Sequence, residues 1–284
     1  MRRNGSLNLL GTVLITMVAL AGSPEKALGE NGLDFMAGGG VYRSNVYPGS
    51  NDYYVVPVPL VRANYRKGDL SFFIGILNGL GVNWVNEEKG LGGSLSARYG
   101  ELRHSEEYSI LGRMMGHSER TKRLLTDTPT ADAPIVYEAT VSYQALKGTI
   151  GGSIAYYPTS LDYKLSGQED RDFNGILASL SYAIEGPVTE KLLLSARVGV
   201  EYMNQGYADA WYTVRFPTSE LKAFEADAGL RGMTISLQVT RMLSEKAGVS
   251  LLSEGTLLTA DAGRSPYTEE KFQPCTLLFA FYNF

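Results

Sequence analysis

Long runs of alternating apolar and polar residues constrain the fold of this chain more than any other feature. In segment 191–203, KLLLSARVGVEYM, the even positions hold Leu, Ala, Val and Tyr, whereas the odd positions include Ser195, Arg197 and Glu201. Segments 135–145, 176–184 and 233–240 alternate in the same way. Successive side chains of a strand point to opposite faces, so each run predicts a β-strand with one apolar and one polar face.

The length of these runs distinguishes two kinds of β-protein. They extend over about 9–13 residues, whereas strands of soluble sandwiches usually have about 5–6 and a tilted membrane strand needs about 9–11. No apolar run of helical-span length follows residue 30, so membrane-spanning helices are not expected. We therefore predict an all-β fold, an antiparallel transmembrane up-and-down β-barrel in which the apolar face meets lipid.

The spacing of the runs predicts about twelve strands. They are expected at 34–43, 53–65, 69–77, 80–86, 91–99, 134–146, 148–157, 173–185, 190–203, 231–243, 246–259 and 274–284. The count stays open between 10 and 12, because 69–77 and 80–86 are short. Short connections alternate with longer ones, except at the Asn-Gly hairpin signal of 78–79. This alternation is typical of barrels with short periplasmic turns and long extracellular loops.

The first 29 residues have the order of a secretory signal peptide. Arg2 and Arg3 precede an apolar run over 7–20, and small residues follow it. Cleavage after Ala21 or after Gly29 fits equally, and an N-terminal anchor helix is the alternative. Residues 30–284 are then expected to form a single outer-membrane barrel domain. The net charge of −4 argues against a nucleic-acid partner, and the single Cys275 excludes an internal disulfide.

Several short segments depart from the simple pattern. Pro57 and Pro59 lie inside a predicted strand, where proline cannot donate a ladder hydrogen bond, so we expect a bulge or a poorly paired seam there. The glycine run 38–40 is interpreted as a place where a neighbouring backbone comes close. Short helices are expected within the loops at 106–115 and 219–228.

The chain ends on an aromatic pair. Tyr282 and Phe284 share the face of Leu278 and Ala280 in the last predicted strand, which is a membrane-girdle position at the periplasmic rim. An aromatic-x-aromatic ending is also similar to the signal by which outer-membrane barrels are recognised during assembly. Phe279 and Phe281 are expected to face the lumen.

Short motifs are spread over most of the mature chain: GGVY at 39–42, YPGSNDYY at 47–54, VPVP at 56–59, GLGV at 79–82, YAD at 207–209, WY at 211–212, FEADAGL at 224–230, LLTADAGRSP at 257–266 and YNF at 282–284. By their order and spacing, the chain resembles the MipA/OmpV family of outer-membrane proteins. The resemblance implies location in a Gram-negative outer membrane, in contact with lipid and lipopolysaccharide. It also implies a scaffold role, because the namesake links a lytic murein transglycosylase to a penicillin-binding protein. The loop 100–133 departs from the family pattern.

The two histidines, His104 and His117, are the only candidates for the histidine base that a serine hydrolase needs. His-Ser-Glu occurs at 104–106 and again at 117–119. A histidine directly before a serine points away from it and cannot act as its base, and the Gly-x-Ser-x-Gly elbow is missing. His104 and His117 also lack the spacing of metal ligands. We therefore expect no catalytic residue, no metal site and no cofactor.

Other charged residues fall into two groups. Asp162, Glu169, Asp170 and Asp172 form an acidic loop cluster, interpreted as a solvated face or as a divalent-cation bridge to lipopolysaccharide. The expected lumen charges are Arg62, Arg98, Glu138, Arg197, Glu201, Arg241 and Glu254. These side chains either pair and fill the barrel or line a pore. The expected function is a non-enzymatic scaffold; the alternatives are a narrow passive pore and, third, an outer-membrane acyl hydrolase.

Overall fold

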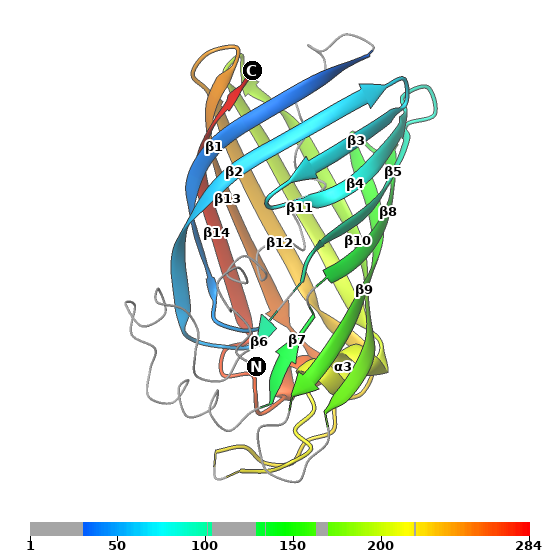
Figure 1. Cartoon of the computed structure of the whole chain (residues 1–284), viewed down its shortest axis with the longest axis vertical. Coiled ribbons are helices and arrows are strands. Elements are labelled where there is room, and N and C mark those ends of the chain that lie inside the picture. The colour runs from blue at the N-terminus through cyan, green and yellow to red at the C-terminus, as the bar shows by residue number, and fades with distance from the viewer. Residues whose placement is uncertain (1–30, 101, 104–128, 134, 163–169, 219) are drawn as a thin grey trace, which may run out of the picture.

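The chain folds into a closed β-barrel of twelve antiparallel strands (Figure 1). The computed structural model describes residues 31–100, 102–103, 129–133, 135–162, 170–218 and 220–284. The wall strands are β1 (Asn31–Asn45), β2 (Tyr53–Lys67), β3 (Leu70–Gly75), β4 (Gly79–Asn86), β5 (Leu91–Tyr99), β8 (Ile135–Ala145), β9 (Gly148–Asp162), β10 (Arg171–Thr189), β11 (Leu192–Met203), β12 (Gly229–Met242), β13 (Ala247–Leu258) and β14 (Phe272–Asn283). The predicted fold class is confirmed.

Each wall strand pairs with the next one along the chain, and β14 pairs with β1 to close the barrel. Two short strands, β6 (Leu102–Arg103) and β7 (Thr130–Asp132), pair with each other, and β7 also pairs with the end of β9. At the end of the barrel that holds the C-terminus, the strands are joined by short turns. We call it the turn end, and the opposite end, which carries the longer connections, the loop end (Figure 1). The separation of β3 from β4 settles the count at twelve.

The outer face of the barrel is apolar along every strand. The large side chains on this face that are 50% to 72% exposed include Leu33, Ile74, Leu95, Val141, Ile154, Leu180, Ile235 and Leu278. A continuous exposed apolar belt is what a barrel presents to acyl chains. Among the described residues, no helix is long and apolar enough to cross a membrane.

The two prolines of β2 lie at an open seam. The pairing of β2 with β1 runs without a register shift, so the expected bulge is wrong. However, β3 pairs with β2 only from Arg62 onward. The N–H of Ile76 donates to the carbonyl oxygen of Val61 at 3.1 Å, which shows that odd residues of β2 direct their backbone groups toward β3. The nitrogens of Pro57 and Pro59 therefore face an edge without a strand partner in the described part, which confirms the poorly paired seam.

Glycines allow the close approach of β14 where the barrel closes. A Cβ atom on Gly38 would lie 2.1 Å from the carbonyl oxygen of Ala280, and one on Gly40 would lie 2.4 Å from that of Leu278. The same absent side chain at Gly40 leaves room for Phe279, which points inward as expected. The interpretation of the glycine run as a close backbone approach is confirmed.

The helices differ from those expected. The described loops contain α3 (Gln205–Trp211) and α4 (Ala260–Arg264). The helix predicted at 219–228 is wrong over its described residues, because Phe224 instead pairs with Val214 in an isolated bridge. The N–H of Ala226 donates to the Thr213 hydroxyl oxygen at 3.0 Å, so the backbone bonds go to a neighbouring segment. The helix expected at 106–115 lies outside the described residues.

The turn between β8 and β9 is strained. Leu146 and Lys147 have φ angles of 52° and 65°, the left-handed region that asparagine and glycine adopt most easily. Replacing the pair by Asn-Gly should raise the free energy of unfolding by about 1–2 kcal/mol, because a left-handed residue with a large side chain costs roughly that much. Urea unfolding in lipid vesicles measures this. The control is the same Asn-Gly replacement at Glu245 and Lys246, whose φ angles are not positive. It should not raise the free energy of unfolding.

Candidate functional site

Three connections at the loop end are joined into one cap. We define the cap as residues 46–52, 204–218, 220–228 and 259–271. The N–H of Asp227 donates to Asp261 Oδ2 at 2.8 Å, and the Ser265 hydroxyl donates to the Tyr212 carbonyl at 2.6 Å. The N–H of Glu269 donates to the carbonyl of Gly49 at 2.7 Å. These bonds connect the β11–β12, β13–β14 and β1–β2 connections to one another.

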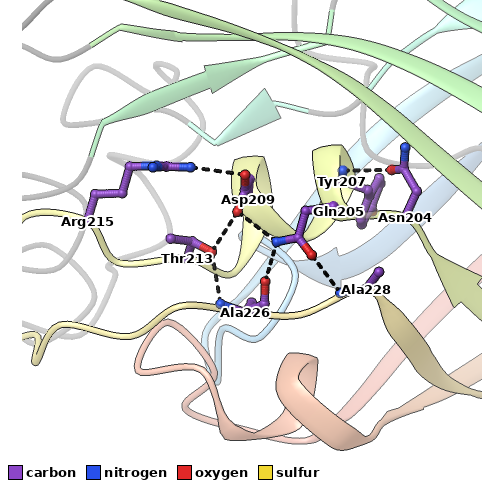
Figure 2. A network of polar contacts seen from close by, with 8 residues as sticks. All are labelled: Asn204, Gln205, Tyr207, Asp209, Thr213, Arg215, Ala226 and Ala228. Atoms are coloured by element: carbon purple, nitrogen blue, oxygen red, sulfur yellow. Dashed lines mark hydrogen bonds and ion pairs between the residues drawn. The ribbon is translucent and has the colours of Figure 1, made fainter.

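Helix α3 begins the largest part of the cap, and its capping residue is Asn204. The Asn204 side chain accepts from the N–H of Tyr207 at 2.9 Å (Figure 2). The next residue, Gln205, joins the helix to the returning chain. Its amide nitrogen donates to the carbonyl of Ala226 at 2.8 Å and its amide oxygen accepts from the N–H of Ala228 at 3.0 Å. The two ends of the β11–β12 connection are therefore fastened together before the chain enters β12.

Asp209 is the polar centre of the same network. Arg215 donates to it at 3.0 Å, Thr213 donates at 3.3 Å and Gln205 donates at 3.1 Å (Figure 2). The opposite side of α3 carries aromatic side chains and faces inward. The polar side of the helix thus fixes the fold of the cap, and its apolar side is available to fill the barrel.

A hydrophobic core lies between the cap and the barrel wall. Tyr207, Trp211 and Tyr212 are at most 1% exposed. They belong to one cluster with Tyr157 and Met203 of the wall, together with residues of β8, β10 and β13. Full burial of a large apolar side chain contributes about 1.5–3 kcal/mol. The cap is therefore packed into the mouth of the barrel on the β8–β13 side rather than lying loosely above it.

Two buried ion pairs lie below this core. Arg98 pairs with Glu138 at 3.4 Å, as expected for lumen charges, and Glu201 pairs with Arg231. We call these four residues the ion-pair layer. The sequence pattern missed Arg231, because it shares the parity of the outward-facing Met233. A register shift between β11 and β12 beside Glu201 turns Arg231 inward.

Tyrosines connect the ion-pair layer to the cap. Arg98 donates to the Tyr157 hydroxyl at 3.4 Å, and Arg231 donates to the Tyr212 hydroxyl at 3.0 Å. The Arg231 guanidinium also lies 5.9 Å from the ring centre of Tyr207, whose ring meets that of Tyr157 edge-on at 5.1 Å. A buried charge is tolerated only when it is paired and hydrogen-bonded. The layer therefore depends on α3 remaining in place.

The lumen is divided into two unlike halves. On the side of β1, β2, β13 and β14, apolar side chains fill the interior; they include Tyr42, Val56, Val58, Leu60, Leu77, Leu252 and Leu277. On the side of β3–β5 and β8–β12 lies a cavity of about 290 Å³. We call it the lumen cavity. Arg62 and Arg197, both expected lumen residues, contribute to its lining.

The other expected lumen charges have different positions. Arg197 and Glu254 lie in register with the buried Ser236 between them, which places both on the inner face. Arg241 is exposed and pairs with Leu192 and Val249 on the outer face near the turn end, so its expected lumen position is wrong. Like Met233 and the other odd-numbered residues of this part of β12, Arg241 faces outward. The apolar stretch of that face ends before it.

The aromatic C-terminus lies on the outer face, as its parity predicts. Tyr282 is 45% and Phe284 66% exposed, and the centres of their rings are 5.0 Å apart. The Phe284 ring also meets that of Phe35 at 5.4 Å, and its N–H donates to the Phe35 carbonyl at 2.9 Å. The last residue is thus fixed to β1 at the turn end. Its role as girdle and assembly signal stays a prediction.

The candidate chemical sites of the sequence fall mostly outside the described residues. Both His-Ser-Glu triplets and Glu169 lie there. Asp162, Asp170 and Asp172 are exposed at the loop end, consistent with a solvated face. Within the described ranges, no three metal-binding side chains come together.

One carboxylate in the cap gives it a pH dependence. The N–H of Asp227, followed by the Arg264 guanidinium, holds the pKa of the Asp261 carboxyl below its usual value of 3.8. A lowered pKa means that this carboxylate stabilises the cap above pH 3.8, and that the stabilisation is lost as the pH falls through the lowered value. We expect Asp261→Asn to reduce amide-exchange protection of 259–271 at pH 7 and to match the wild type well below pH 3.8. A constant difference at both pH values would contradict this.

Comparisons with known proteins identify the chain's family. Residues 37–284 match the family described as MltA-interacting protein MipA. A search of curated proteins found no match.

Solved structures of outer-membrane proteins are similar to this chain at low sequence identity. An outer-membrane channel of Pseudomonas putida F1 has a TM-score of 0.46 and 13% identity, over 89% of this chain and 96% of that one. OmpF of Salmonella typhi has a TM-score of 0.39 and 10% identity, over 90% and 98%. The channel DcaP of Acinetobacter baumannii has a TM-score of 0.36 and 9% identity, over 89% and 97%.

The twelve-strand barrel and the family match together place the protein in the outer membrane. In such barrels the short turns are periplasmic, so the turn end faces the periplasm and the cap faces outward. The family match covers nearly all of the barrel, from β1 to the last residue. This chain belongs to the MltA-interacting protein MipA family of outer-membrane barrels.

Proposed function

We propose that the protein is a non-enzymatic scaffold that holds murein-remodelling enzymes at the periplasmic face of the outer membrane. The observation that carries this proposal is the packed cap, whose aromatic core and ion-pair layer occupy the outer mouth of the barrel. A barrel blocked there is suited to work from its periplasmic end rather than as an open channel. The family description, which names an interaction with MltA, supports the same role.

The proposed partners are a lytic murein transglycosylase and a penicillin-binding protein, bound across the periplasmic rim. The turns at this rim are short, so a partner has to contact several of them to bury the roughly 800 Å² per side of a stable interface. The outer apolar belt is proposed to contact lipid and, in the outer leaflet, lipopolysaccharide. We further propose that residues 1–29 are removed during export.

Photo-crosslinking in cells tests the scaffold proposal. A crosslinking amino acid at Glu88, Lys147 or Glu245 places the probe in three different periplasmic turns. The same amino acid at the exposed Lys222 of the cap is the matched control. We expect murein enzymes to be captured from the turns and not from Lys222. Failure to capture them from any turn, or equal capture from Lys222, would overturn the proposal.

The alternative function, a narrow passive pore, requires the cap to open. The lumen cavity favours it, because this half of the lumen is not filled by side chains. Planar-bilayer recording of the purified protein separates the two functions: silence supports the scaffold, and discrete conductance steps support the pore.

A further inference from the structure

The lumen cavity is closed above and extends to the periplasmic turns. Its upper lining includes Glu138 and Glu201 of the ion-pair layer. Its lower lining includes Val85, Thr149 and Glu185, which lie at the ends of β4, β9 and β10 next to the short turns. A solute therefore enters this space from the periplasm and meets a fixed roof.

The charges around the cavity are matched in number, because the cations Arg62, Arg98, Arg197 and Arg231 are balanced by the carboxylates Glu138, Glu185, Glu201 and Glu254. Glu138 is held by Arg98 and Glu201 by Arg231. Arg197 is faced by Glu254 and Glu138. Moving a charged solute from water into such a site costs desolvation free energy that no surplus opposite charge repays. The electrostatics of the cavity thus disfavour both anions and cations.

The rest of the lining consists largely of hydroxyl groups and glycines. Serine and threonine side chains line it from β3, β5 and β8–β12. Four of these hydroxyls form two hydrogen-bonded pairs, Ser94 with Thr140 at 2.7 Å and Ser153 with Ser179 at 2.8 Å. Because a hydroxyl both donates and accepts, such pairs can share further bonds with a ligand hydroxyl.

One buried hydroxyl in the described lining has no hydrogen-bond partner. Ser195 is 5% exposed and its oxygen makes no hydrogen bond among the described residues. A buried polar group without a partner is destabilising, and a hydrogen bond to a ligand would remove this cost. Ser236 offers a comparison, since it is 2% exposed and equally without a partner there, but it does not line the cavity.

We propose that the lumen cavity binds a small uncharged polyhydroxyl solute, a sugar of one or two rings, which enters from the periplasm. Its volume is at the lower limit of small-molecule pockets, which measure about 300–1,000 Å³. Matched charges exclude ionic competitors, and the hydroxyl lining supplies directional bonds. The inference does not depend on the identity of the proposed protein partners.

The test measures sugar binding to the full-length mature barrel in a detergent that contains no sugar. N-acetylglucosamine is compared with glucosamine, the same ring with a charged amine, and with the anionic glucuronate, by titration calorimetry and saturation-transfer NMR. We expect N-acetylglucosamine to bind with a millimolar dissociation constant and both charged sugars at least tenfold more weakly. Absence of N-acetylglucosamine binding, or tighter binding of either charged sugar, would overturn the proposal.

Two serine variants locate the site. Ser195→Ala should weaken N-acetylglucosamine binding roughly fivefold, the effect of one lost hydrogen bond of about 1 kcal/mol. Ser236→Ala should leave the dissociation constant within twofold. Both variants should keep the heat-modifiable gel shift of a folded barrel, which shows that a loss of binding is not a loss of fold. Equal weakening by the two substitutions would place the sugar elsewhere and contradict the assignment.

Discussion

Removing the cap helix should turn a silent barrel into a conducting one. We expect a variant in which 205–228 is replaced by a short glycine–serine linker to show discrete conductance steps in planar bilayers, whereas the wild type shows none. The deletion takes out Tyr207, Trp211 and Tyr212, the centre of the core in the barrel mouth. It also removes the tyrosines that hold the ion-pair layer from above. The lumen cavity then extends toward the outer mouth.

The wall itself should survive this deletion. The pairing of β11 with β12 begins at Met203 and Gly229, outside the replaced segment. The substitution Lys222→Ala is the matched control, because this cap side chain is exposed and the helix stays in place. A deletion variant that keeps the heat-modifiable gel shift and remains silent would contradict the account of the cap as the block.

Substitution of Gly40 by leucine should prevent the barrel from closing. A Cβ atom there would lie 2.4 Å from the Leu278 carbonyl oxygen and 2.7 Å from the Phe279 Cβ, so β1 and β14 cannot keep their spacing. We expect a loss of about 3 kcal/mol or more in the free energy of unfolding, at or above the usual range for overpacking. Loss of the heat-modifiable gel band is the simplest measurement of this effect.

The neighbouring Gly39 provides the control for this substitution. It faces outward, and a Cβ atom there would meet nothing closer than the Val58 carbonyl oxygen at 3.8 Å. Gly39→Leu should therefore change the free energy of unfolding by no more than about 0.5 kcal/mol, as for other surface substitutions. Similar effects of the two substitutions would mean that the β1–β14 contact is not the tight one described.

The wall of the barrel was predictable because lipid imposes a period of two on every strand. Ile235 and Leu237 face out, and Thr234 and Ser236 face in, so a short window of sequence contains the whole signal. The glycine run and the proline seam were also predictable, since they are local departures from that period. Even the Asn-Gly signal at 78–79 correctly separated two short strands.

The contents of the barrel mouth were not predictable in the same way. Arg231 has outward parity in the sequence, and only the register shift beside Glu201 brings it into the lumen. The position of α3 depends on contacts between Gln205 and residues 21 to 23 positions later, which no local pattern encodes. The helix expected at 219–228 failed for the same reason, because distant partners took its backbone bonds.

Depth-sensitive fluorescence along β12 tests the central claim most directly. Single tryptophans are placed at each position of 233–240 in a protein whose native Trp84 and Trp211 are changed to phenylalanine, and the barrel is folded into vesicles of brominated phospholipid. The account predicts strong quenching at the four odd positions, which face acyl chains, and weak quenching at the four even positions, which face the lumen. Quenching that does not alternate, or that is absent at every position, would contradict a lipid-embedded barrel with a separate interior.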